Sequence, residues 1–224
     1  VMAAITRVPG VRYGALVPNV RGFEAALAAG ADEVAVFASA SEGFSRANIN
    51  ASIAESLERF QPVMARAREA GLPVRGYVSC VTDCPYDGAV APEAVARVAG
   101  ELREMGCFEV SLGDTLGRGA PERVDAMLGA VLERVEAQAL AGHFHDSFGR
   151  ALENVSVALG RGLRVFDGSV AGLGGCPYAP GAAGNVSSEA LAVFLEAAGF
   201  EHGLDLARLR AAADVAVGLR EGAE

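Results

Sequence analysis

Six short apolar runs, rich in β-branched or aromatic residues, recur along the chain and constrain its fold more than any other feature. They begin about 20 to 40 residues apart, with amphipathic segments between them, and this spacing is typical of βα units whose strands pair in parallel. The runs occupy residues 13–19, 33–39, 74–80, 108–114, 140–146 and 164–170.

The segments between the runs carry residues that commonly begin and end helices. Asn19 precedes the first segment, Gly71 and Gly106 follow the next two, and Pro121 opens the fourth. Glycine suits the residue after a helix because it tolerates positive φ, and proline suits the first helical turn because that N–H lacks an intrahelical partner. We therefore expect helices between the strands.

Most of the predicted strands end on a polar residue. In a (β/α)8 barrel the strand ends and the loops after them build the active site, so this pattern predicts an α/β fold of the TIM barrel type. An open, doubly wound sheet is the alternative, but no G-x-G-x-x-G fingerprint follows a first strand. The polar ends are Asn19, Ser39, Cys80, Asp114, His145, Asp146 and Ser169.

Six βα units are fewer than the eight of a closed barrel. We expect an N-terminally incomplete TIM (β/α)8 barrel with C-terminal helices, and we interpret the abrupt start at Val1, without methionine, as the loss of two N-terminal units. No Ser/Pro-rich linker or charge run divides the sequence, so residues 1–224 are expected to form a single catalytic domain.

Composition narrows the possible partners. The 224 residues are 51% hydrophobic with a mean hydropathy of +0.28, enough to bury a large core. A net charge of -9 argues against a nucleic-acid partner. The sequence contains no run of 18 apolar residues, so it predicts no membrane-spanning helix. Four cysteines without a secretory signal favour free thiols in a reducing compartment.

The sequence GHFHDSFG places two of the three histidines two residues apart, at the end of a predicted strand. Alternate residues of a strand share a face, so His143 and His145 should converge in the barrel mouth while Phe144 points into the helix layer. Two such imidazoles make half of a metal site. The H-x-H pattern alone leaves an alternative to metal binding, in which one histidine is a hydrogen-bonded core residue and the other lies on the surface. The third, His202, is expected on the surface between helices.

A glycine-rich segment, residues 167–185, surrounds Cys176. So much glycine permits positive φ and close backbone approach to a ligand, so the segment could serve as a lid that presents Cys176 for proton transfer. A plain surface loop is the alternative. Cys80 and Cys84 are interpreted as two reduced thiols lining a βα loop, and Cys107 as a small core residue.

Five stretches together resemble the 3-hydroxy-3-methylglutaryl-CoA (HMG-CoA) lyase family, within the metal-dependent pyruvate-carboxylase-like TIM barrel superfamily. The resemblance runs from about residue 8 to residue 220, and the GLGGCPYA motif is specific to the lyases. The stretches are NVRGFEAALAAGADEVAVFASASEGFSRANINASIAESLERF, VRGYVSCVTDCPYDG, MGCFEVSLGDTLGRG, GHFHDSFGRALENVSVALGRG and SVAGLGGCPYAPGAAGN.

The resemblance implies roles for particular residues. The divalent metal, Mg²⁺ or Mn²⁺, would be bound by His143, His145 and Asn185. The catalytic residues would be Cys176, in acid/base chemistry, and Asp114, as an active-site carboxylate. The substrate pocket would be shaped by Asn48, Arg75 and Tyr77.

The implied activity is cleavage of HMG-CoA to acetyl-CoA and acetoacetate, as in leucine degradation and ketone-body formation. The implied protein is a homodimer with an acyl-CoA substrate, in a bacterial cytoplasm or, in a eukaryote, the mitochondrial matrix. The family's Arg-Asp strand motif and the glutamate of its second strand have no match here, and Asp146 is not the missing aspartate.

Two alternatives stay open. A related aldolase or Claisen synthase would share the H-x-H strand but not Cys176 in its motif. The second alternative is a non-enzymatic protein, namely a truncated barrel without activity that acts only through subunit contacts.

Overall fold

The predicted strands form one parallel sheet. The computed structural model describes residues 2, 4–174 and 184–221. The sheet follows the order β1-β2-β3-β6-β7-β8, so each strand pairs with the next one along the chain, apart from a separate small hairpin. The strands are β1 (Gly14–Leu16), β2 (Glu33–Ser39), β3 (Val74–Ser79), β6 (Glu109–Asp114), β7 (Leu140–Phe144) and β8 (Val165–Asp167).

Several helices begin or end at the residues that the sequence predicts. The Asn19 side chain accepts a hydrogen bond from the Gly22 amide, and Gly71 and Gly106 follow their helices with φ of 65° and 107°. No described helix is long and apolar enough to cross a membrane. The α-helices are α1 (Val20–Ala28), α2 (Glu42–Ile49), α3 (Ile53–Ala70), α4 (Pro92–Met105), α5 (Pro121–Leu132), α6 (Ala151–Gly160), α7 (Ser188–Ala197) and α8 (Leu206–Glu221), with 3₁₀ turns η1 (Ala137–Ala139) and η2 (Val170–Gly172).

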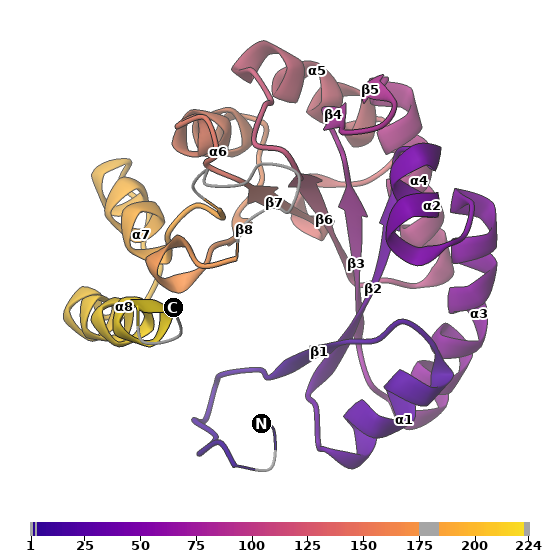
Figure 1. Cartoon of the computed structure of the whole chain (residues 1–224), viewed down its shortest axis with the longest axis horizontal. Helices are drawn as coiled ribbons and strands as arrows, with labels where there is room; N and C mark the ends of the chain where they lie inside the picture. The colour runs from indigo at the N-terminus through magenta and orange to yellow at the C-terminus, as the bar shows by residue number, and fades with distance from the viewer. Residues whose placement is uncertain (1, 3, 175–183, 222–224) are drawn as a thin grey trace.

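The sheet curls, and the helices follow its convex side, as Figure 1 shows. A doubly wound sheet would reverse its strand order and place helices on both faces, so the sequential order excludes that alternative. The barrel-type fold predicted from the sequence is therefore confirmed, with six of the eight strands of a closed barrel among the described residues.

The two faces of the sheet differ in chemistry because alternate residues of each strand point in opposite directions. On β3, Val74 and Val78 face the helices and are buried, whereas Arg75, Tyr77 and Ser79 face the concave side. Phe144 of β7 is buried in the hydrophobic core, as expected. The convex side thus holds the core, and the concave side is free to carry polar groups.

Two elements beside β3 were not predicted, namely α2 and the hairpin β4 (Asp83–Cys84) with β5 (Gly88–Ala89). The hairpin is held to α2 by Asp87, whose carboxylate accepts hydrogen bonds from the Ser41 hydroxyl at 2.6 Å and the Gly43 amide at 2.7 Å. Strands of two residues are too short to show a periodic pattern in the sequence.

Gly142 tests the packing of the core beneath the histidine strand. A Cβ at Gly142 would lie 2.7 Å from Cε2 of Phe144 and 3.1 Å from Cδ1 of Phe166. Gly142→Ala should therefore overpack this region and lower the free energy of unfolding by about 1 to 3 kcal/mol, measured by urea denaturation. In the control Gly160→Ala, at an exposed helical position, the new Cβ meets nothing within 4 Å, and stability should be unchanged or slightly higher. Equal effects of the two substitutions would contradict this packing.

Candidate functional site

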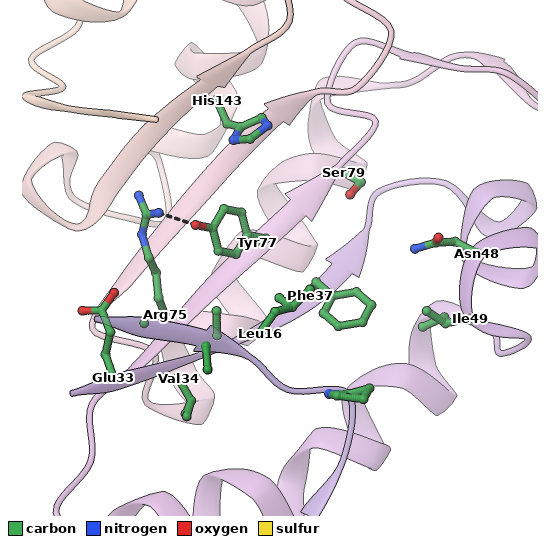
Figure 2. Close-up of a pocket in the computed structure, with 14 residues that line it drawn as sticks. Leu16, Glu33, Val34, Phe37, Asn48, Ile49, Arg75, Tyr77, Ser79 and His143 are labelled. Carbon is green, nitrogen blue, oxygen red and sulfur yellow. Dashed lines mark hydrogen bonds between the residues drawn. The ribbon is translucent and has the colours of Figure 1, made fainter. Parts of the chain in front are cut away.

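A cavity of about 830 Å³ opens on the concave side of the sheet. It is lined by Tyr77 and Arg75 of β3, His143 of β7, and Asn48 and Ile49 of α2, among others (Figure 2). The three residues that the resemblance assigned to the substrate pocket, Asn48, Arg75 and Tyr77, therefore share one cavity with His143.

The structure brings the three expected metal ligands together, by a different route from the one predicted. Strand β7 ends at Phe144, so His145 lies just beyond it, and its backbone instead forms an antiparallel bridge with Asn185. The ring centroids of His143 and His145 are 5.4 Å apart. The bridge, rather than a longer strand, places Asn185 opposite His145.

The donor atoms fit a divalent cation. His145 Nδ1 is buried without a hydrogen-bond partner among the described residues. Burial, together with the nearby His143, lowers the pKa of His145 to about 4, so its imidazole is neutral at pH 7 and has a lone pair to donate. The Asn185 amide donates to the carbonyls of Leu173 (2.9 Å) and Gly174 (3.2 Å), which leaves its own carbonyl oxygen for a cation.

The ligand set remains small within the part of the chain that the structure describes. No three His, Cys, Asp or Glu side chains gather there as a metal-binding group. Two imidazoles and one amide oxygen therefore make up the candidate site, and Asp146 adds nothing to it because its carboxylate accepts from the Ala151 amide at the start of α6.

Arg75 is the centre of a buried ion network on the concave face. It is 9% exposed, and its guanidinium contacts Glu109 Oε1 at 2.6 Å and Asp167 Oδ1 at 2.8 Å. The same group donates to the Tyr77 hydroxyl, as Figure 2 shows. Burial opposes the charge of Arg75, but Asp167, Tyr77 and Glu109 together outweigh it, and the pKa of Arg75 is raised.

The network extends through Asp167 to His143, a candidate metal ligand. Oδ2 of Asp167 accepts from the Ser111 hydroxyl at 2.7 Å and lies 3.1 Å from Nδ1 of His143. Burial would raise the pKa of Asp167, yet the hydrogen bond with His143 and the charge of Arg75 lower it overall. The carboxylate is therefore an ionised acceptor for three donors.

Asp114 ends β6, as expected, but it does not line the cavity. Its side chain is fully buried, and its two oxygens accept from the Thr82 hydroxyl and the Gly119 amide, both at 2.9 Å. Burial raises the pKa of Asp114, and these two hydrogen bonds oppose the rise. In this position Asp114 ties together the loops that follow β3 and β6.

The other described cysteines and the third histidine lie outside the candidate site. Cys176 lies outside the described residues. The expected free thiols Cys80, Cys84 and Cys107 are buried, and Cys107 packs in the core as predicted. His202 is not the surface residue that we expected, since its side chain is only 10% exposed beside α7, with Nε2 3.3 Å from Glu196 Oε1.

Sequence reasoning missed Glu109, Ser111 and Asp167. A signal was present, because a charged residue inside an otherwise apolar strand is seldom buried without a partner. Glu109 in FEVSLGD and Asp167 in RVFDGSV both fit that description. Identifying the partners requires the strand register, which pairs Arg75 with Glu109 and His143 with Asp167.

The fold and the site define a class. A parallel sheet in chain order, helices on its convex side and paired imidazoles near the carboxyl ends of its strands are the features of a barrel-type protein with a candidate metal site. The HMGL-like family matches residues 3–216, and the chain belongs to this family.

Curated relatives carry the name of one activity. The chain is 59% identical over 197 residues to the hydroxymethylglutaryl-CoA lyase of Pseudomonas mevalonii, covering 88% of this chain and 65% of that protein. It is 56% identical to the cytoplasmic 3-hydroxy-3-methylglutaryl-CoA lyase of Danio rerio, covering 96% of this chain and 64% of that protein. The chain thus spans a little under two thirds of the length of these relatives.

A solved structure matches the whole described fold. The HMG-CoA lyase of Brucella melitensis aligns with a TM-score of 0.97 at 61% identity, covering 98% of this chain and 78% of that one. The carboxyl transferase domain of Rhizobium etli pyruvate carboxylase aligns with a TM-score of 0.66 at 18% identity, a likeness of fold alone.

Asp114 provides a test of how the loops around the site are held. Asp114→Ala would leave the Thr82 hydroxyl and the Gly119 amide without their acceptor in a buried position. We expect the free energy of unfolding to fall by about 2 to 4 kcal/mol in urea denaturation. The matched control Asp214→Ala, at an exposed position on α8, should have almost no effect. A stability for Asp114→Ala equal to that of the control would show that these contacts do not hold the loops.

Proposed function

We propose that the protein containing this chain cleaves HMG-CoA to acetyl-CoA and acetoacetate. The grouping of His145 and Asn185 with His143, which lines the cavity, carries the proposal, because it supplies nitrogen and oxygen donors where a cation could meet a substrate. Membership of the HMGL-like family and the names of the relatives support the choice of substrate.

The reaction is a retro-Claisen cleavage. The bond between C2 and C3 breaks, the C3 hydroxyl loses its proton as that carbon becomes the ketone of acetoacetate, and the carbon released as the acetyl thioester gains a proton. A divalent cation, Mg²⁺ or Mn²⁺, would supply Lewis-acid polarisation of the hydroxyl and carbonyl oxygens. The two imidazoles and the Asn185 amide would hold it, and hard oxygen atoms of the substrate would complete a ligand set that suits these ions.

The concave side would orient the substrate. Tyr77 and Asn48 present polar groups to the cavity, and the ring of Tyr77 meets that of His143 edge-on at 6.2 Å. Asp114 acts in this proposal by fixing the loops above β6, and its assignment as a catalytic carboxylate rests on the resemblance alone. The homodimer, the role in leucine degradation and the location also rest on resemblance; the relatives include both cytoplasmic and mitochondrial lyases by name.

Removal of one imidazole should separate a metal-dependent lyase from its alternatives. His145→Ala should lose Mn²⁺ binding in calorimetry and lose acetoacetate release from HMG-CoA, because a ligand with a buried, unpaired nitrogen is gone. The control His202→Ala removes a histidine that lies against Glu196 of α7 and is not one of the candidate ligands, so it should retain both. Full activity of His145→Ala would contradict the proposal. Condensation of an α-keto acid by the unaltered protein would instead favour a Claisen synthase.

The proton donated to the acetyl carbon is assigned, as a proposal from the resemblance, to Cys176. Cys176→Ala should lower kcat by about 100- to 10,000-fold, the range for loss of a general acid, while Mn²⁺ binding persists. Cys107→Ala is the matched control, since this thiol is buried in the core and should not affect kcat. An unchanged kcat in Cys176→Ala would remove the cysteine from the mechanism.

A further inference from the structure

Asp167 receives donors from three different strands on the concave face. Arg75 of β3 contacts one carboxylate oxygen, while Ser111 of β6 and His143 of β7 contact the other. The side chain is 19% exposed. No role for this aspartate follows from the motifs in the sequence.

The chemistry of the neighbours determines where the proton of His143 lies. An ionised carboxylate only accepts hydrogen bonds, and a neutral imidazole carries one N–H. Asp167 is kept ionised by the guanidinium of Arg75 at 2.8 Å. His143 must therefore donate from Nδ1 to Asp167, and its lone pair is left on Nε2, the nitrogen that remains for a ligand.

We propose that Asp167 is a positioning residue that fixes the tautomer and the ring orientation of His143 for binding of a divalent cation. This inference rests on the metal site of the proposed function and deepens it. Carboxylates that hold a ligating histidine through its second nitrogen are a general device for tuning metal sites. Arg75 belongs to the same arrangement, since it anchors Asp167 and is itself anchored by Glu109 at 2.6 Å.

The substitution Asp167→Asn should reverse the tautomer. Asparagine has one accepting oxygen, which Arg75 would retain because a guanidinium can only donate. The amide NH₂ would then face His143, whose Nδ1 could only accept, so the ring proton would move to Nε2. The lone pair needed by the cation would be lost from that side of the ring.

The first measurement uses the unaltered, metal-free protein. Long-range ¹H–¹⁵N NMR correlation with ¹⁵N-labelled histidine, in mildly alkaline buffer, distinguishes the two neutral tautomers. We expect the proton of His143 on Nδ1 in the unaltered protein and on Nε2 in Asp167→Asn. A proton on Nε2 in the unaltered protein overturns the inference, even if the variant fails to fold.

The second measurement is Mn²⁺ affinity, followed by electron paramagnetic resonance of the free ion. Asp167→Asn should bind Mn²⁺ about 10- to 100-fold more weakly than the unaltered protein. The matched control is Glu109→Gln, which also removes a carboxylate from Arg75 but leaves the Asp167 partner of His143 in place, and it should retain the affinity and the tautomer. A merely structural role for Asp167 predicts equal effects of the two substitutions and would overturn the inference.

The two proposals fail in different ways. If the unaltered protein binds no Mn²⁺, the metal site of the proposed function is wrong, and the positioning of a metal ligand by Asp167 falls with it. If the unaltered protein binds Mn²⁺ and Asp167→Asn binds it equally well, only the positioning role is overturned.

Discussion

The ion pair between Arg75 and Asp167 is the contact on which the concave face depends. Arg75 lies on β3 and Asp167 on β8, three strand positions apart, which in a flat sheet would separate the strands by about 14 Å. The 2.8 Å contact therefore requires the curl of the sheet. Both groups are largely buried, so loss of Arg75 would leave the Asp167 and Glu109 carboxylates without their cation, at a cost of about 3 to 5 kcal/mol.

The candidate site is anchored on both sides of the two imidazoles. On one side, Asp167 connects His143 to the network around Arg75. On the other, the backbone bridge between His145 and Asn185 joins the end of β7 to the segment that precedes α7. The buried charges thus give the concave side a polar surface, although burying them costs free energy. Continuous apolar packing in their place would have closed the cavity. Specificity of position, rather than stability, is what such a network can supply.

The sequence predicted what depends on local pattern and missed what depends on register and curvature. The strands and helix ends follow from apolar runs and from residues such as Asn19 and Gly71, whose conformations are determined nearby. The H-x-H pattern predicted two of the candidate ligands, although His145 is placed by a bridge and not by strand alternation. Asp167, a charge in a short apolar strand, indicated only that a partner was needed, because its partners come from strands up to 92 residues away in the chain.

The central claim is that Asp167, held by Arg75, presents Nε2 of His143 to a divalent cation. A crystal structure of the protein grown with Mn²⁺, with the ion located by anomalous scattering, tests it most directly. The account predicts Mn²⁺ bound by Nε2 of His143, the His145 ring and the Asn185 carbonyl oxygen, with Asp167 still hydrogen-bonded to Nδ1. An ion coordinated by Asp167 itself, or by Nδ1 of His143, would contradict the account.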